Sequence, residues 1–186
     1  QKDYWPAKEY IEEALQLYKN SAAKDADTNN PYIAISLNNL GVVYESMEQH
    51  LEAEKRYTEA LAIYRKLARN NPQAYNHYVA VTLNNLGYLY IGKVEPEYGR
   101  AEANCKESLD IYRALAAENP QAWNPFLALS LHNMARFYQQ KYPNKTLSIQ
   151  LVEEAIKILD QCSDDYELVR EVRNKAKRVL EIWQEN

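Results

Sequence analysis

The chain has 186 residues and a formal net charge of −4, with 22 Lys and Arg against 26 Asp and Glu. It lacks the basic excess typical of a nucleic-acid binder, and no apolar run approaches the roughly 18 residues that cross a membrane. No nucleic acid and no membrane insertion are therefore expected, and the compartment is open, leaning toward the cytoplasm. Only 4 Gly in the whole chain favour helices over sheets with tight turns.

Self-similarity orders the predicted elements. The segment IAISLNNLGVVY at 33–44 recurs as VAVTLNNLGYLY at 79–90 and as LALSLHNMARFY at 127–138. A second family of segments recurs between them, namely YIEEALQLY at 10–18, YTEALAIYR at 57–65, CKESLDIYR at 105–113 and VEEAIKILD at 152–160. Two interleaved helical segments that share one period predict helix–turn–helix repeats stacked into a solenoid.

Eight helices are expected, at residues 3–20, 31–46, 50–70, 77–91, 98–118, 125–140, 146–161 and 164–184. Asn at an N-cap, followed in two cases by Pro, predicts helix starts at Asn30-Pro31, Asn76-His77 and Asn124-Pro125. The preceding helices are expected to end at Asn71-Pro72 and Asn119-Pro120, because the residue before Pro avoids helical backbone.

These elements predict a single all-α domain over residues 1–186. It consists of a leading second helix at 3–20, repeats at 31–70, 77–118 and 125–161, and a C-terminal capping helix at 164–184. The leading helix has no first-helix partner, which suggests either that more solenoid precedes Gln1 or that this helix is itself a cap.

Small residues and tyrosines recur at fixed places in the repeat. At about 100° per residue, Leu37, Leu40, Gly41 and Tyr44 fall on one side of their helix. Gly at this point is expected to let the second helix of the repeat approach closely. The tyrosines that recur with the repeat period are expected to pack between helices; they are Tyr18, Tyr44, Tyr64, Tyr90, Tyr112 and Tyr138.

The pattern Leu37, Leu40, Gly41, Tyr44, Ala53, Tyr57, Ala60 resembles the tetratricopeptide repeat signature, with Leu in place of the family's first Trp. The repeats here are longer than the usual 34 or so residues. They resemble the long-repeat subgroup similar to kinesin light chain, and residues 71–86 and 119–134 resemble bacterial repeats of the form NPxAYxPxLAxTLNNL. The resemblance implies a right-handed α–α superhelix whose first helices line a concave groove for peptides or partner helices.

The groove side of each first helix supplies the candidate peptide-binding residues, which are Asn38, Asn39, Val42, Asn84, Asn85, Tyr88, His132, Asn133 and Arg136. A primary amide can pair with both polar groups of a peptide unit, so an Asn column could hold an extended backbone. The alternative is that these amides bridge neighbouring helices. Tyr88 and Arg136 would supply selectivity, unless Tyr88 packs between repeats and Arg136 is only solvated.

The sequence offers no catalytic constellation. Its three histidines are scattered over different repeats, and Cys105 and Cys162 form neither a disulfide framework nor a metal site. No catalytic residue, metal or cofactor is expected, and the protein is not expected to be an enzyme. The expected function is a protein–protein interaction module that binds a peptide or helical segment of another protein. The alternative is a structural spacer or a self-association element that forms a homo-oligomer and has no exogenous ligand.

Overall fold

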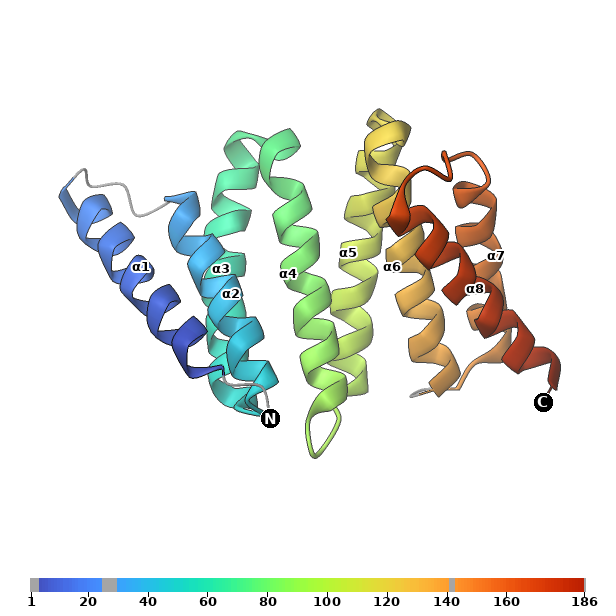
Figure 1. Cartoon of the computed structure of the whole chain (residues 1–186), viewed down its shortest axis with the longest axis horizontal. Coiled ribbons are helices and arrows are strands. Elements are labelled where there is room, and N and C mark those ends of the chain that lie inside the picture. The colour runs from blue at the N-terminus through green and yellow to red at the C-terminus, as the bar shows by residue number, and fades with distance from the viewer. Residues whose placement is uncertain (1–3, 25–29, 141–142, 186) are drawn as a thin grey trace. The chain divides into compact units, whose positions relative to one another are not determined.

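The computed structural model describes residues 4–24, 30–140 and 143–185, and in these every regular element is a helix (Figure 1). The helices are α1 (Trp5–Lys24), α2 (Pro31–Ser46), α3 (His50–Asn70), α4 (Pro72–Gly92), α5 (Tyr98–Glu118), α6 (Pro120–Gln140), α7 (Lys145–Leu159) and α8 (Glu167–Glu185). The all-α class is confirmed. Residue 3, where the first helix was expected to begin, lies outside the described residues.

The chain divides into two compact units, Gln1–Glu97 with α1 to α4 and Tyr98–Asn186 with α5 to α8. In the first unit α2 packs against α1 and α3, and α3 also packs against α4. In the second unit α6 packs against α5 and α7, and α8 lies on both α6 and α7. A buried cluster of Ala135, Val152, Ala176 and Val179 joins these last three helices. α8 thus packs on the two helices of the third repeat.

Gly41 lies where α2 meets α3 most closely. A Cβ atom at Gly41 would be 2.5 Å from two ring atoms of Tyr57, which is itself fully buried. The hydroxyl of Tyr57 also donates to Glu45 at 2.8 Å, and this hydrogen bond holds the ring in its place beside Gly41. The expectation that Gly permits close approach is confirmed at this position.

Two helix starts differ from the prediction by five residues, and α8 begins three residues later than expected, at Glu167. α4 begins at Pro72 and α6 at Pro120, five residues before the expected starts at 77 and 125. The caps are Asn71, which accepts from Ala74 N at 3.2 Å, and Asn119, which accepts from Ala122 N at 3.2 Å. Each Asn-Pro pair therefore ends one helix and begins the next, and Pro125 lies inside α6. The start at Pro31 is confirmed, because Asn30 accepts from Tyr32 N at 2.9 Å.

The recurring tyrosines join successive repeats, as expected. A tyrosine late in each first helix donates to a glutamate on the preceding second helix, in the pairs Tyr44–Glu12 at 2.9 Å, Tyr90–Glu54 at 2.9 Å and Tyr138–Glu102 at 2.6 Å. A tyrosine late in each second helix stacks on an aromatic ring of the next first helix, in the pairs Tyr18–Tyr32, Tyr64–Tyr78 and Tyr112–Phe126. The tyrosine content is thus explained by packing between repeats.

Candidate binding surface

The first helices α2 and α4 lie side by side in the first unit and run in the same direction (Figure 1). With about 100° per residue, one side of each helix faces away from the second helices. We call this side the α2–α4 face, and it consists of Ile35, Asn39, Val42, Val81, Asn85 and Tyr88. It holds four of the nine candidate residues that the sequence predicts, Asn39, Val42, Asn85 and Tyr88.

Asn38 lies at the seam between α2 and α4. Its Oδ1 accepts from Nδ2 of Asn85 at 3.2 Å and lies 3.2 Å from the hydroxyl of Thr82. That hydroxyl donates to the Tyr78 carbonyl at 2.8 Å. Asn38 and Asn85 thus bridge two helices, which is the alternative that the sequence left open for the Asn column. Thr82 is fully buried at this seam, and the sequence analysis did not predict this role for it. The signal was available, because the same repeat position holds a hydroxyl residue in the other repeats, Ser36 and Ser130.

The remaining predicted residues of the face are open to solvent. Asn39 is exposed, and it makes no side-chain hydrogen bond to another of the described residues. Val42 is 45% exposed and Tyr88 39% exposed, one helical turn beyond the Asn38–Asn85 bond. Asn85 keeps its Oδ1 for a second partner, because only its Nδ2 is used in the bond to Asn38. Amide and apolar groups therefore alternate along this face.

The second unit carries three predicted residues, all on α6, and one of them requires a correction. His132 is only 2% exposed, so a ligand on the outer surface cannot reach it. Burial, followed by the positive charges of Arg136 and Lys175, lowers the pKa of His132 to about 4, and neither ring nitrogen has a hydrogen-bond partner among the described residues. His132 occupies the repeat position of Asn38. It faces toward α8, the helix that carries Lys175, and is therefore not a binding residue.

Asn133 is half-buried, whereas Arg136 is exposed and lies 3.5 Å from the Oε1 of Gln140. Asn84, which occupies the same repeat position as Asn38 and His132, is half-buried in the first unit. The nine predicted residues are therefore divided between two compact units and between seam and open positions.

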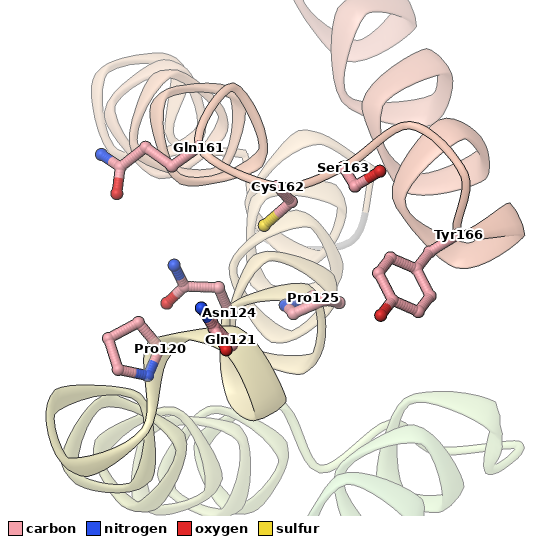
Figure 2. A pocket seen from close by; sticks show the side chains of 8 residues that line it. All are labelled: Pro120, Gln121, Asn124, Pro125, Gln161, Cys162, Ser163 and Tyr166. Atoms are coloured by element: carbon pink, nitrogen blue, oxygen red, sulfur yellow. The ribbon is translucent and has the colours of Figure 1, made fainter.

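A pocket of about 430 Å³ lies in the second unit between the start of α6 and the loop that precedes α8. Figure 2 shows Cys162 and Tyr166 of that loop facing Asn124 and Pro125 of α6. Burial raises the pKa of the Cys162 thiol, which donates to the Ile158 carbonyl at 3.5 Å, so this group is not poised as a nucleophile. The sequence missed this pocket because Asn124 was assigned to a helix cap.

Metal-binding side chains are not gathered in the part of the chain that the structure describes. Among those residues, no three His, Cys, Asp or Glu side chains come together as a metal site. None of the helices in the described ranges has the length and apolar character of a membrane span.

Comparisons with known proteins identify the repeat. Residues 7–66 match a family described as tetratricopeptide repeat. The crystal structure of BtubC (BKLC) from P. vanneervenii is similar with a TM-score of 0.68 and 24% identity, over 83% of this chain and 56% of that chain. Nearly identical TPR-like repeats of a putative kinesin light chain from Podosopora anserina give a TM-score of 0.52 and 18% identity, over 97% of this chain and 90% of that one.

No curated protein matches the chain. The chain spans just over half the length of BtubC, and at these identities the solved structures show the fold alone. The family match, the close contact of Gly41 with Tyr57 and the shared helical-repeat architecture agree with one another. Residues 7–66 thus match the tetratricopeptide repeat family, and the chain has the TPR-like helical-repeat fold of these solved structures.

Proposed function

We propose that the chain is a protein–protein interaction module, and that its α2–α4 face binds a segment of a partner protein. Tetratricopeptide repeats generally mediate protein–protein interaction, and this general role is supported by the family match over residues 7–66. Binding at the α2–α4 face in particular is our assignment, and we propose Asn133 and Arg136 on α6 as separate contact residues of the second unit. No reaction is assigned to the protein.

One observation carries this proposal. Val42 and Tyr88 are large apolar side chains that remain exposed on first helices whose other apolar residues are mostly buried, such as Leu37, Leu40 and Leu83. Beside them lie the amides of Asn39 and Asn85. Rigid aromatic and aliphatic anchors next to hydrogen-bonding groups are the composition of protein-binding surfaces.

The test is affinity capture from a lysate of the native organism, followed by mass spectrometry. Wild type is compared with the Val42→Ser/Tyr88→Ala variant, which removes both apolar anchors. We expect a partner that wild type enriches and that this variant loses by at least about tenfold, which corresponds to about 1.4 kcal/mol.

A matched control keeps loss of folding apart from loss of binding. Val94 is 96% exposed in the loop after α4, and Tyr166 is 65% exposed just before α8, so Val94→Ser/Tyr166→Ala makes the same chemical changes elsewhere. This control should retain the partner, and all three proteins should melt within a few degrees of one another. Equal capture by all three would show that the α2–α4 face is not the binding site.

Self-association is the second candidate function, and a feature of α1 favours it. Tyr10 is 73% exposed and Leu17 is 62% exposed, on the side of α1 opposite Leu15 and Ala22, which are buried. Light scattering of the eluted protein across a concentration series tests this function. A dimer that Tyr10→Asp/Leu17→Asp converts to a monomer would support it, and a monomer at all concentrations would refute it.

A further inference from the structure

A groove of about 450 Å³ lies between the second helices α1 and α3 of the first unit, and α2 forms its floor. Its apolar lining consists of Ala22 on α1, Ile33 and Leu37 on α2, and Ala62 and Ile63 on α3. At about 100° per residue, Leu37 lies about 200° around α2 from Asn39. This α1–α3 groove and the α2–α4 face are therefore on opposite sides of α2.

One charge of each sign borders the α1–α3 groove. Lys19 of α1 is exposed and has no hydrogen-bond or ion-pair partner among the described residues. Glu59 of α3 is already paired with Arg56 on its own helix, with 3.4 Å between the Arg56 Nη1 and Glu59 Oε2 atoms. The ammonium group of Lys19 is therefore the charge at this groove that lacks a counter-ion within the described ranges.

The second unit shows how the same place in the repeat is closed. Lys19 and Glu59 occupy the repeat positions of Arg113 on α5 and Glu154 on α7. There Nη2 of Arg113 donates to both carboxylate oxygens of Glu154, at 3.1 and 2.9 Å. This ion pair joins the two second helices directly, whereas the corresponding pair is not formed between α1 and α3.

Two differences in sequence account for the open groove in the first unit. On α3 the carboxylate of Glu59 is engaged by Arg56, but the residue at the position of Arg56 on α7 is Leu151. The carboxylate of α7 is thus left for the cation of α5. The second difference is Ala62, whose equivalent on α7 is Lys157, so the groove wall of the first unit is small and apolar.

The open groove specifies the chemistry of its occupant. A large aliphatic side chain would remove the apolar lining from water, and a carboxylate beside it would give Lys19 the counter-ion that Arg113 obtains from Glu154. Burial of one such side chain is worth only about 10- to 100-fold in affinity, and an exposed ion pair adds little more. A free aliphatic acid would therefore bind weakly, whereas a protein segment adds contacts with the neighbouring surface of α1 and α3.

We propose that the α1–α3 groove is a second docking site, which binds a partner-protein segment that carries a large aliphatic side chain next to an acidic residue. The aliphatic side chain lies on Ile33 and Leu37 between the two second helices, and the acidic residue pairs with Lys19. Because this groove and the α2–α4 face lie on opposite sides of α2, the chain can hold two partners at once. The inference goes beyond the proposed function and does not depend on it.

The probe is a phage-displayed library of random peptides, selected on the full chain with Val42→Ser/Tyr88→Ala so that the α2–α4 face does not compete. Selected peptides are synthesised, and their Kd for the wild-type chain is measured by fluorescence anisotropy. We expect a recurring aliphatic residue next to Asp or Glu. Ala62→Phe, which fills the groove, should weaken these peptides at least about tenfold.

The ion pair is tested separately by reversing its charges. Lys19→Glu should weaken the selected peptides about fivefold or more at low salt, and replacing the acidic residue of the peptide by Lys should restore part of the loss. Ala103→Phe on α5 and Lys177→Glu on α8 make the same changes at exposed positions of the second unit and should leave the Kd unchanged. Lys19 and Ala62 are exposed as well, so all four variants should melt within a few degrees of wild type.

The inference is overturned if selection yields no peptide with an acidic residue beside an aliphatic one, or if Ala62→Phe and Lys19→Glu bind the selected peptides as tightly as wild type does. A wild-type chain that elutes as a dimer, and that Ala62→Phe converts to a monomer, would also overturn it, because a second copy would then occupy the groove. Loss of partner capture with Val42→Ser/Tyr88→Ala is a separate result, so either proposal can fail while the other stands.

Discussion

The contact between Gly41 and Tyr57 fixes how closely α2 and α3 approach each other. An exposed helical Gly→Ala change is expected to stabilise a protein by up to about 1 kcal/mol. At Gly41 the added methyl group would meet the fully buried Tyr57 ring at 2.5 Å, and the ring is further held by its bond to Glu45. Gly41→Ala should therefore lower the free energy of unfolding by about 1–3 kcal/mol, as overpacked cores do.

Gly99→Ala is the matched control, because Gly99 lies in α5 and a Cβ atom added there would meet no other atom within 4 Å. It should be neutral or slightly stabilising in the same urea titration. Equal unfolding midpoints for the two variants would mean that α2 and α3 can move apart at little cost.

His132 should make the free energy of unfolding depend on pH in the acidic range. Its pKa is lowered to about 4 by burial and by the charges of Arg136 on α6 and Lys175 on α8, against about 6.5 in the unfolded chain. The neutral ring is therefore favoured in the folded protein. Its contribution is fully present above about pH 6.5 and is lost as the pH falls toward 4.

His132→Leu removes this titration and the two unpaired ring nitrogens. The variant should lose about 3 kcal/mol less stability than wild type between pH 7 and 4, as measured by urea unfolding at several pH values. His77 has a pKa that is lowered by burial, and it titrates in both proteins, so its effect cancels in the comparison. Parallel pH profiles for the two proteins would show that His132 is hydrated or paired in solution.

At the scale of elements, the repeat period was enough to predict the number, order and pairing of the helices within the described residues. It did not separate two candidate starts for α4 and α6, because an Asn that could cap the helix occurs at both, and in α6 a Pro follows each of them. In the structure α6 begins after Asn119, because the side chain of Asn119 accepts a hydrogen bond from Ala122 N. The later Pro125 is tolerated inside the helix.

The binding surface was predicted less well, and for a different physical reason. A helical wheel places Asn38, Asn39 and Val42 on one broad side of α2, and the position of the neighbouring helix decides which of them stays open. α4 covers Asn38 through Asn85, whereas Val42 remains exposed. His132 was missed as a buried residue because its cover, α8, is a cap with a sequence unlike that of the repeats.

Helix α8 should depend on its apolar contacts with α6 and α7 to stay attached to the second unit. Val179 is buried among Ala135, Val152 and Ala176, and the indole of Trp183 donates to Ser148 at 2.8 Å. Val179→Asp would place a charge in this apolar contact and should lower stability by about 3 kcal/mol. Asn174→Asp adds the same charge on the exposed side of α8 and should have little effect. Thermal melting followed by circular dichroism compares the two, and similar melting temperatures would show that α8 is only loosely attached.

At the scale of the whole molecule, the two compact units each have a core of their own. Gly41 and Tyr57 lie in Gln1–Glu97, and Val179 with its neighbours lies in Tyr98–Asn186. In helical-repeat proteins the stability is a sum of local terms, because each repeat contacts only its neighbours. A destabilising substitution should therefore increase local opening mainly within its own unit.

Hydrogen exchange measured by mass spectrometry tests this with the two destabilising variants. Gly41→Ala should speed exchange in α2 and α3 and leave α6 to α8 near the wild-type rates, whereas Val179→Asp should do the reverse. Each variant serves as the control for the other, because both lower the total stability by a few kcal/mol. If each variant instead speeds the exchange of the slowest amides equally in both units, the chain opens as one cooperative body. Partner binding on the α2–α4 face would then stabilise α8 as well.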